Sequence, residues 1–346
     1  MRRRRVAVTA AVAAAVAALL TWSVSVVAAP ARPRTIAVVC SSIEDLCRTW
    51  AEEYTRETGV GVDMVRLSSG EALARLSRPG GADEFDVWHG GPAESYIVAG
   101  QRGLLLPYVS PEASAVLPAY RDAAGAWTGV YLGVLGFCTD RDVLDRLGVP
   151  TPTSWDDLLS PRLVGQVSVP NPVTSGTGYT HVWTQRARLG SDDAAVAYLR
   201  RLDRNVLQYT ASGMSPPGVA ARGEVAIALA FTQHCVKAQR EGHPDLVVTY
   251  PREGTGFEIG SVAIVAGTRQ RDLARRYVDF AISAAGQRLG ADTNSRQLPT
   301  RPDVPTDPRL AVGVPLLGME SGGDGLQGAA DARARLTQRV VAEVQR

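Results

Sequence analysis

The sequence predicts an α/β protein, because short apolar segments typical of strands alternate along the chain with amphipathic segments of helical spacing. Hydrophobic residues make up 45% of the 346 positions, as in ordinary globular proteins, and the length suggests two domains. The chain carries 37 basic and 35 acidic residues. This near-balance disfavours a nucleic-acid-binding protein, which usually has a strong basic excess.

The first residues differ in composition from the rest of the chain. Arg2–Arg5 form a positive cluster, Val6–Ala29 carry no charge, and small residues surround Pro30. This order predicts an export signal over residues 1–31 and a protein that works outside the cytoplasmic membrane. The apolar run is long for a signal, so an uncleaved anchor is the alternative.

Strands and helices are expected in alternation from Thr35 onward. The expected strands are Thr35–Val39, Gly61–Arg66, Asp86–His89, Val130–Thr139, Gln166–Pro170, Val225–Ala230, Leu246–Tyr250 and Ser261–Ala266. The expected helices are Ser42–Thr58, Glu71–Leu76, Glu94–Gly100, Asp142–Leu147, Trp155–Leu159, Tyr179–Leu189, Asp192–Leu202, Pro217–Arg222, Arg271–Ser283 and Gln327–Val344.

Four cysteines, Cys40, Cys47, Cys138 and Cys235, have a spacing that fits no zinc site. An exported protein folds in an oxidising compartment, which favours disulfides. Cys40 follows the first strand and Cys47 lies in the second turn of the next helix, so we expect a disulfide between them. Cys138 and Cys235 then form either a second disulfide or two buried thiols.

Four short loops of serine, threonine and glycine lead into helices, and they are interpreted as lying at strand ends. A helix N-terminus offers free backbone N–H groups, hydroxyls add donors, and glycine lets a ligand approach closely. In open α/β sheets, ligands bind at the carboxyl ends of strands. The loops therefore predict an oxyanion-binding cleft, although any one of them alone is typical of a helix cap. The candidate residues are Ser41, Ser42, Ser68, Ser69, Gly70, Thr174, Ser175, Gly176, Thr177, Ser212 and Gly213.

Signals of catalysis are few. His89 and His234 stand at strand ends, but no nucleophile elbow and no phosphate loop with its lysine occurs in the sequence. The acid pairs Asp156–Asp157 and Asp192–Asp193 lie in first turns of helices, where acids complement the helix dipole. We therefore expect a binding protein with no catalytic residues, no metal and no cofactor.

Six segments together resemble the extracytoplasmic solute-binding proteins of ATP-driven (ABC) importers, type 2 topology, in the branch that binds ferric iron, sugar phosphates or phosphonates. The resemblance covers the chain from about Thr35 to the C-terminus. The segments are Val39–Cys47, Asp86–Gly91, Gly133–Phe137, Thr153–Leu158, Pro170–Tyr179 and Pro251–Gly260.

The resemblance implies two lobes, each a mixed sheet flanked by helices, that are joined by two hinge strands and close on a ligand. Lobe one would comprise 33–129 and 258–346, and lobe two 130–257. The Cys40–Cys47 pairing is also similar to that of one subgroup. The implied partners are a small anionic solute and a membrane permease, for a monomer that binds no nucleic acid.

The resemblance also implies which loop selects the ligand. The segment after Val225–Ala230 holds adjacent tyrosines in ferric-iron binders and a His-Asp pair in sugar-phosphate binders. Here Gln233 and His234 occupy it, and no Tyr-Tyr pair occurs in the chain. This disfavours direct iron binding and leaves a sugar phosphate, a phosphonate or another phosphoester open. A ferric-iron-binding protein and a ligand sensor are the alternatives.

Two further residues are candidate ligand contacts. Trp88 can stack on a ligand or belong to the core of its lobe. Glu253 precedes Gly254-Thr255-Gly256, which can be only a hinge turn, but its counterpart in sugar-phosphate relatives touches the sugar.

Overall fold

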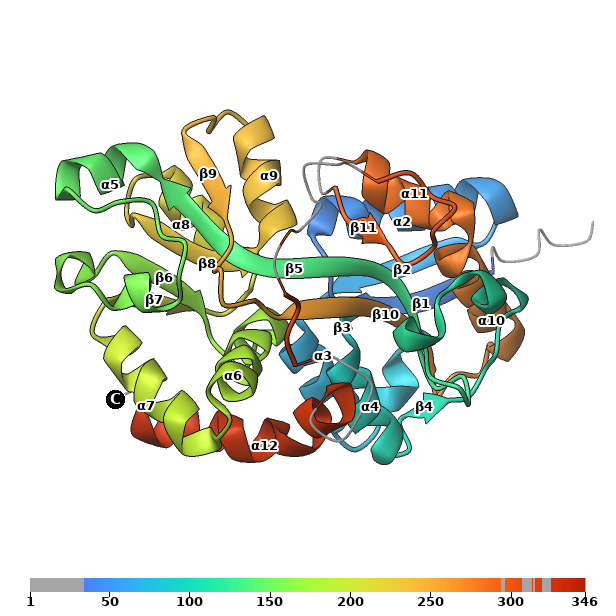
Figure 1. The fold of residues 1–346 in the computed structure, drawn as a ribbon. Coiled ribbons are helices and arrows are strands. Elements are labelled where there is room, and N and C mark those ends of the chain that lie inside the picture. Colours follow the sequence, from blue (N-terminus) through green and yellow to red (C-terminus); the bar gives the residue numbers. More distant parts are fainter. Residues whose placement is uncertain (1–33, 294–295, 307–312, 314, 319–324, 346) are drawn as a thin grey trace, which may run out of the picture. The chain divides into compact units, whose positions relative to one another are not determined.

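The computed structural model describes residues 34–293, 296–306, 313, 315–318 and 325–345. The predicted signal over residues 1–31 lies outside the described residues. From Thr35 onward the chain forms a two-lobed α/β body (Figure 1). In the described part of the chain, no helix has the length and apolarity needed to cross a membrane.

The sheet of the first lobe has the order β2-β1-β3-β10-β5. Its first three strands run parallel, because helices connect them, and β10 enters antiparallel between β3 and β5. The strands of this lobe are β1 (Thr35–Cys40), β2 (Gly61–Arg66), β3 (Val87–Pro92) and β10 (Phe257–Val265), with the short β4 (Leu105–Leu106) and β11 (Leu298–Pro299) at its margins.

The second lobe shares one strand with the first. The long β5 (Thr128–Asp140) pairs with β10 through its first half and with β8 and β9 through its second half (Figure 1). Beyond β8 the order continues to β6 and β7. The other strands of this lobe are β6 (Val167–Pro170), β7 (Val206–Thr210), β8 (Ile227–Phe231) and β9 (Leu246–Thr249). The polypeptide therefore crosses between the lobes in β5 and again at the start of β10.

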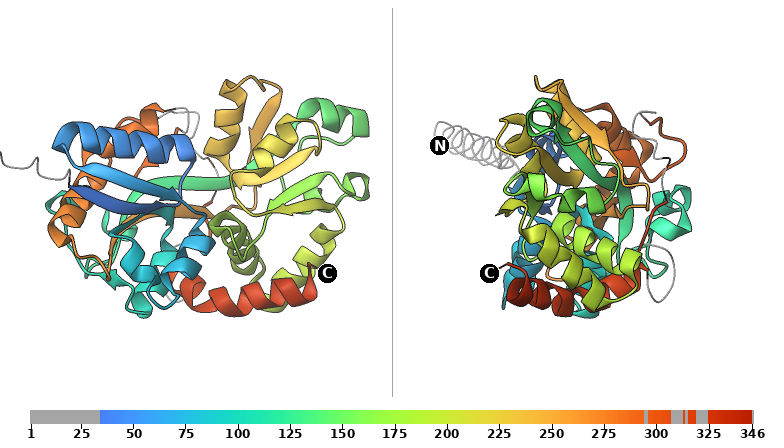
Figure 2. Two further views of the ribbon diagram at one scale, coloured as in Figure 1. Left: turned by 180° about the vertical axis from the view of Figure 1, so that it is seen from behind. Right: turned by 60° about the vertical axis from the view of Figure 1, so that its left-hand side comes forward.

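Helices cover the faces of both sheets (Figure 2). In the first lobe Trp50 of α2 and Tyr277 of α10 are fully buried against Ile36 and Val38 of β1. In the second, Phe137 of β5 packs edge-on against Trp155. The helices are α2 (Glu44–Thr58), α3 (Ser69–Leu76), α4 (Ala93–Gln101), α5 (Arg141–Leu147), α6 (Gly176–Leu189), α7 (Asp192–Asp203), α8 (Pro216–Ala221), α9 (Thr232–Arg240), α10 (Arg271–Ile282), α11 (Ala284–Asp292) and α12 (Leu326–Glu343), with 3-10 turns at Gly81–Glu84, Pro111–Ala115, Pro118–Tyr120, Asp156–Leu159 and Pro161–Leu163.

The last helix, α12, contacts both lobes and lies along one edge of the body, beneath α4 and α7 (Figures 1 and 2). Arg333 makes a buried ion pair of 2.9 Å with Glu94 of α4. Its guanidinium also lies 4.6 Å from the ring centre of Tyr179 on α6. On the other side, Arg335 and Arg339 pair with the acids Asp192 and Asp193 of α7. The sequence-based division placed all of 258–346 in lobe one, whereas α12 is bonded to elements of both proposed segments.

Two disulfides are present, Cys40–Cys47 and Cys138–Cys235. The first joins the end of β1 to α2, as the sequence predicts. The second confirms pairing over the alternative of two buried thiols, and it joins β5 to the first turn of α9.

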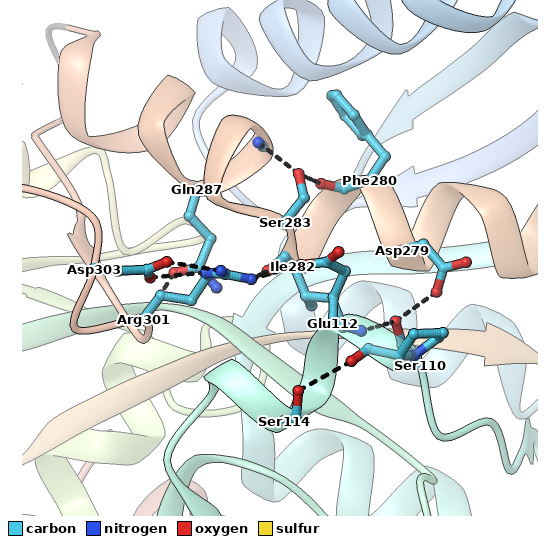
Figure 3. Close-up of polar contacts among 12 residues, drawn as sticks. Ser110, Glu112, Ser114, Asp279, Phe280, Ile282, Ser283, Gln287, Arg301 and Asp303 are labelled. Atoms are coloured by element: carbon cyan, nitrogen blue, oxygen red, sulfur yellow. Dashed lines mark hydrogen bonds and ion pairs between the residues drawn. The ribbon is translucent and has the colours of Figure 1, made fainter.

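A polar cluster in the first lobe connects α10 and α11 to the segment around Arg301 (Figure 3). The Arg301 guanidinium donates to Asp303 and to Glu112, at 2.8 Å and 2.7 Å. The Gln287 side chain accepts from the backbone N–H of Thr300 and Arg301. Because these groups satisfy one another, the cluster holds three chain segments together.

Most expected elements are found within a few residues of their predicted bounds. Five strands and helices were not expected, namely β4, β7, β11, α9 and α11. The segment after β8, expected as a loop, is the start of α9, and Trp155–Leu159 forms only a 3-10 turn at Asp156–Leu159. The run Thr232–Arg240 is mostly polar, and it becomes a helix because Cys235 and Val236 are buried against the sheet.

Candidate functional site

The four serine- and glycine-rich loops meet at one small cavity between the lobes, about 30 Å³ in volume. Each loop follows a strand, so the loops converge where the carboxyl ends of the strands of both lobes face one another. The residues that line the cavity are Ser41, Ser42, Arg66, Ser68, Ser69, Gly91, Pro92, Tyr131, Ser175, Gly176, Thr177, Ser212, Gly213, Met214, Phe231, His234 and Glu258.

The loops of the two lobes touch directly beside this cavity. Backbone N–H of Gly70 and the hydroxyl of Ser68 both donate to the carbonyl of Thr174, at 3.1 Å and 2.7 Å. From the other side, N–H of Gly176 donates to Ser69 Oγ at 3.0 Å. A Cβ on Gly70 would lie 2.4 Å from the carbonyl oxygen of Val173, so this approach requires glycine.

Two of the loops open helices with side-chain caps. Ser68 and Glu71 form a capping box at the start of α3. Ser175 caps α6, and its Oγ accepts from N–H of Gly178 at 3.3 Å. Ser68 and Ser175 also line the cavity, so the same side chains that cap the helices can contact a bound molecule. The positive ends of α3 and α6 therefore point toward this space.

Arg66 brings a full positive charge to the cavity. It is the last residue of β2, and its guanidinium donates to the Ser42 carbonyl at 3.2 Å and to Ser212 Oγ at 3.0 Å. Burial lowers its pKa from the usual arginine value, but a guanidinium stays protonated in proteins. Because Ser212 belongs to the other lobe, Arg66 bridges the cleft. Sequence reasoning missed it, although it directly precedes the loop that begins at Leu67.

The two crossing strands contribute Tyr131 and Glu258 to the wall of the cavity. The hydroxyl of Tyr131 on β5 accepts from N–H of Gly91 at 3.0 Å, and burial raises the pKa of this phenol. Glu258 on β10 is only 4% exposed, and burial raises the pKa of its carboxyl well above the usual value, with the Glu94 charge adding to the effect. A Cβ on Gly260 would lie 2.1 Å from the Tyr131 ring, so glycine is needed where the ring crosses β10. Neither Tyr131 nor Glu258 was predicted, because no local motif marks them.

His234 and Gln233 lie in the first turn of α9. His234 lines the cavity, and burial lowers its pKa to about 3, aided by the charges of Arg66 and Lys237. It is therefore neutral near pH 7 and can either donate or accept. Gln233 is buried behind the wall. A Cβ on Gly133 would lie 2.6 Å from its Nε2 and 2.7 Å from Oε1 of Glu258, so both polar atoms lie over the same point of β5.

Four other predicted residues do not line the cavity. The Trp88 indole is fully buried, stacks on Tyr96 and donates to Ser41 Oγ at 2.9 Å, so it positions Ser41. Gly70 and Thr174 form the contact between the lobes described above. Glu253 accepts from the hydroxyl of buried Ser154.

Larger grooves also lie on the surface. One of about 700 Å³ lies between α4, α12 and residues 172–173, and one of about 740 Å³ lies between α2 and β2. Size does not identify the site here, because the serine- and glycine-rich loops of both lobes converge, together with half-buried Arg66, at the small interlobe cavity. That part of the chain also contains no cluster of three His, Cys, Asp or Glu side chains suited to a metal.

Comparison with known proteins assigns the family. The model of the family described as bacterial extracellular solute-binding protein matches residues 99–316. The chain belongs to this family. The family is one of solute-binding proteins, and the sequence predicted a binding protein.

Relatives of this solute-binding protein include a Haemophilus influenzae protein that is named only as uncharacterized. It is 35% identical over 259 residues, or 73% of this chain and 74% of the relative. A Salmonella typhi protein named "Putative 2-aminoethylphosphonate-binding periplasmic protein" is 25% identical over 263 residues, or 74% of each chain.

Among solved structures, the periplasmic binding protein AfuA from Actinobacillus pleuropneumoniae, with exogenous fructose-6-phosphate bound, is 32% identical with a TM-score of 0.82. The match covers 91% of this chain and 99% of AfuA. The expected two-lobed type 2 fold of periplasmic binding proteins is therefore confirmed.

Proposed function

We propose that this solute-binding protein captures a small phosphate- or phosphonate-bearing solute in the interlobe cavity and delivers it to an ABC permease. The observation that carries the proposal is the convergence of serine and threonine hydroxyls, two helix N-termini and Arg66 on one cavity. Such donors suit an oxyanion, because hydrogen bonds to a charged acceptor are roughly twice as strong as neutral ones.

Binding requires the lobes to separate first. Ligand sites for small organic molecules occupy about 300–1,000 Å³, whereas this cavity holds about 30 Å³. Hydrogen bonds between the 68–70 loop and the 174–176 loop close the cavity: Gly70 and Ser68 donate to Thr174, and Ser69 accepts from Gly176. We therefore propose hinge bending in β5 and at the start of β10, with lobe one at 33–129 and 258–346, lobe two at 130–257, and α12 spanning both.

The same proposal places the protein outside the cytoplasmic membrane. Membership of an extracellular solute-binding family, two disulfides and the basic and apolar pattern of residues 1–31 all support export through an N-terminal signal. The solute is passed from there to the permease in the membrane, and we expect the protein to act as a monomer.

Ligand screening tests the proposed class. Fructose 6-phosphate, 2-aminoethylphosphonate, fructose and ferric citrate are each added to the purified protein, and the melting temperature is measured. A phosphorylated or phosphonate ligand at a hundred times its Kd stabilises by about 2.7 kcal/mol. We expect a clear upward shift with one of the first two compounds and none with fructose.

Two outcomes contradict this proposal. Equal shifts from fructose 6-phosphate and fructose would mean that the oxyanion is not recognised. If ferric citrate alone raised the melting temperature and coloured the protein, the ligand would be iron and not an oxyanion. Phenolate oxygen is a suitable ligand for ferric iron, and Tyr131 is the only tyrosine among the cavity-lining residues.

A further inference from the structure

Glu258 is the only carboxylate among the residues that line the cavity. It lies on β10 directly opposite Gly133 of β5, where the two crossing strands pair, and it is 4% exposed. The remaining polar groups of the wall are hydroxyls, backbone amides, an imidazole and a guanidinium, all of which can donate to an anion. A carboxylate among them is unexpected, since it can only accept and repels the ligand.

The groups that face Glu258 do not offset a negative charge. They are Glu94 and Tyr96 from α4, Tyr131 from β5 and the Gln233 amide from α9. Arg333 is already paired with Glu94. Arg66, the cation of the cavity wall, donates to the Ser42 carbonyl and to Ser212 Oγ, and Glu258 is not among its partners. In the described part of the chain, no salt bridge reaches Glu258. An ionised carboxylate here would lose its hydration without gaining a partner, which is costly in a protein interior.

We propose that Glu258 is a proton-binding site of the cleft, which takes up a proton together with the anionic ligand. In its neutral form the side chain no longer repels the anion and can donate its O–H to an oxyanion or to a ligand hydroxyl. This inference rests on the proposed function and adds that binding is coupled to protonation. The raised pKa of the Glu258 carboxyl agrees with it.

The other titratable groups of the wall stay in one form near neutral pH. Burial lowers the pKa of His234 to about 3 and raises that of Tyr131, and Arg66 remains a cation. Below the pKa of Glu258 in the free protein, affinity does not depend on this group. Above that pKa, each binding event requires proton uptake, so affinity falls by up to tenfold per pH unit.

Titration calorimetry with fructose 6-phosphate tests the coupling from about pH 5.5 to about pH 9.5 in the wild type, Glu258→Gln and Glu224→Gln. Glutamine keeps the size of the neutral acid. Glu224 is a surface residue paired with Arg222, so its variant serves as the matched control. Ionisation of the phosphate itself affects all three proteins equally. We expect wild type and control to weaken together at alkaline pH, and Glu258→Gln to keep its affinity.

A second readout uses the wild type alone. Calorimetry at alkaline pH in buffers of different ionisation enthalpy counts the protons taken up with the ligand. We expect uptake that rises toward one proton as Glu258 ionises in the free protein. Parallel pH profiles for wild type and Glu258→Gln, or binding without proton uptake, would overturn the proposal. The proposed function would survive either result, because fructose 6-phosphate would still bind.

A third readout needs no ligand. A carboxyl whose pKa is higher in the folded than in the unfolded protein makes folding less favourable as pH rises above the unfolded value. The urea midpoint of the wild type should therefore fall relative to that of Glu258→Gln between about pH 5 and about pH 8. A difference between the two midpoints that stays constant across this range would refute a neutral Glu258 even if none of the tested phosphate compounds bound.

Discussion

At the scale of single residues, the candidate site depends on side chains that serve the fold and the cavity at once. Ser175 caps α6 and lines the cavity, and Arg66 ends β2 and bonds to both lobes. Trp88 holds Ser41 from within the core. A substitution at such a position changes both stability and binding, so a matched control is needed to separate the two.

Ser175→Ala provides this separation, with Ser191→Ala as the control. Ser191 caps α7 by the same bond, from Ala194 N–H at 3.2 Å, and does not line the cavity. Each substitution should cost about 1 kcal/mol of folding stability through loss of the cap. Only Ser175→Ala should also weaken ligand binding, by roughly tenfold, because it removes a hydroxyl donor to a charged group.

The measurements are urea denaturation for stability and calorimetry of the folded variants with the ligand identified by screening. If Ser175→Ala lowered the melting point but kept the wild-type Kd, the loop would be a helix cap and nothing more.

At the scale of elements, each lobe has a disulfide next to a cavity loop. Cys40–Cys47 encloses Ser41 and Ser42, and Cys138–Cys235 attaches the start of α9, next to His234, to β5. The two bonds differ in the length of chain they close, at 7 and 97 residues of separation. Both sulfur pairs are almost fully buried.

Replacing Cys138 and Cys235 together by serine should destabilise the protein more than replacing Cys40 and Cys47. In the chain-entropy model, closing a loop of about 100 residues contributes about 4.7 kcal/mol, whereas a loop of under ten residues contributes about 2–3 kcal/mol. Urea denaturation of the two double variants measures the difference. Equal losses, or a larger loss at Cys40 and Cys47, would mean that strain or unfolded-state structure outweighs loop length.

At the scale of the whole described body, α12 connects the two lobes outside the hinge. It is linked to α4 by the buried pair Arg333–Glu94 and by a hydrogen bond from Gln101 to Asp331, and to the second lobe by Tyr179 and the acids of α7. Opening the cleft must alter one of these two sets of contacts. The first set contains one buried ion pair, whose contribution can be tested directly.

Arg333→Met should destabilise the protein by about 3–5 kcal/mol, since it leaves Glu94 buried without its partner. The double variant Arg333→Met with Glu94→Gln should recover a large part of this loss, because no buried charge then remains unpaired. A double-mutant cycle by urea denaturation measures the coupling. Additive losses would show that the pair contributes no coupling energy.

The sequence alone determined the α/β class, most element bounds, the strand-end loops and the Cys40–Cys47 disulfide. These features are local, because strand periodicity, helix caps and glycine-rich turns are written in neighbouring residues. Ten of the predicted ligand residues line the cavity in the structure. Nine of them belong to these loops, and the tenth is His234. Whether they bind a ligand stays a prediction.

Only the tertiary structure decided which distant residues complete the cavity. Arg66, Tyr131 and Glu258 belong to three different strands, and no spacing in the chain relates them. The tertiary structure also decided that the polar segment α9 is a helix, because its Cys235 is bonded to Cys138 of β5. It likewise decided that Glu253 bonds to Ser154 and does not line the cavity. Local patterns specify the elements, but pairing of β5 with β10 and closure of the lobes set which side chains share a space, since those contacts join residues more than a hundred positions apart.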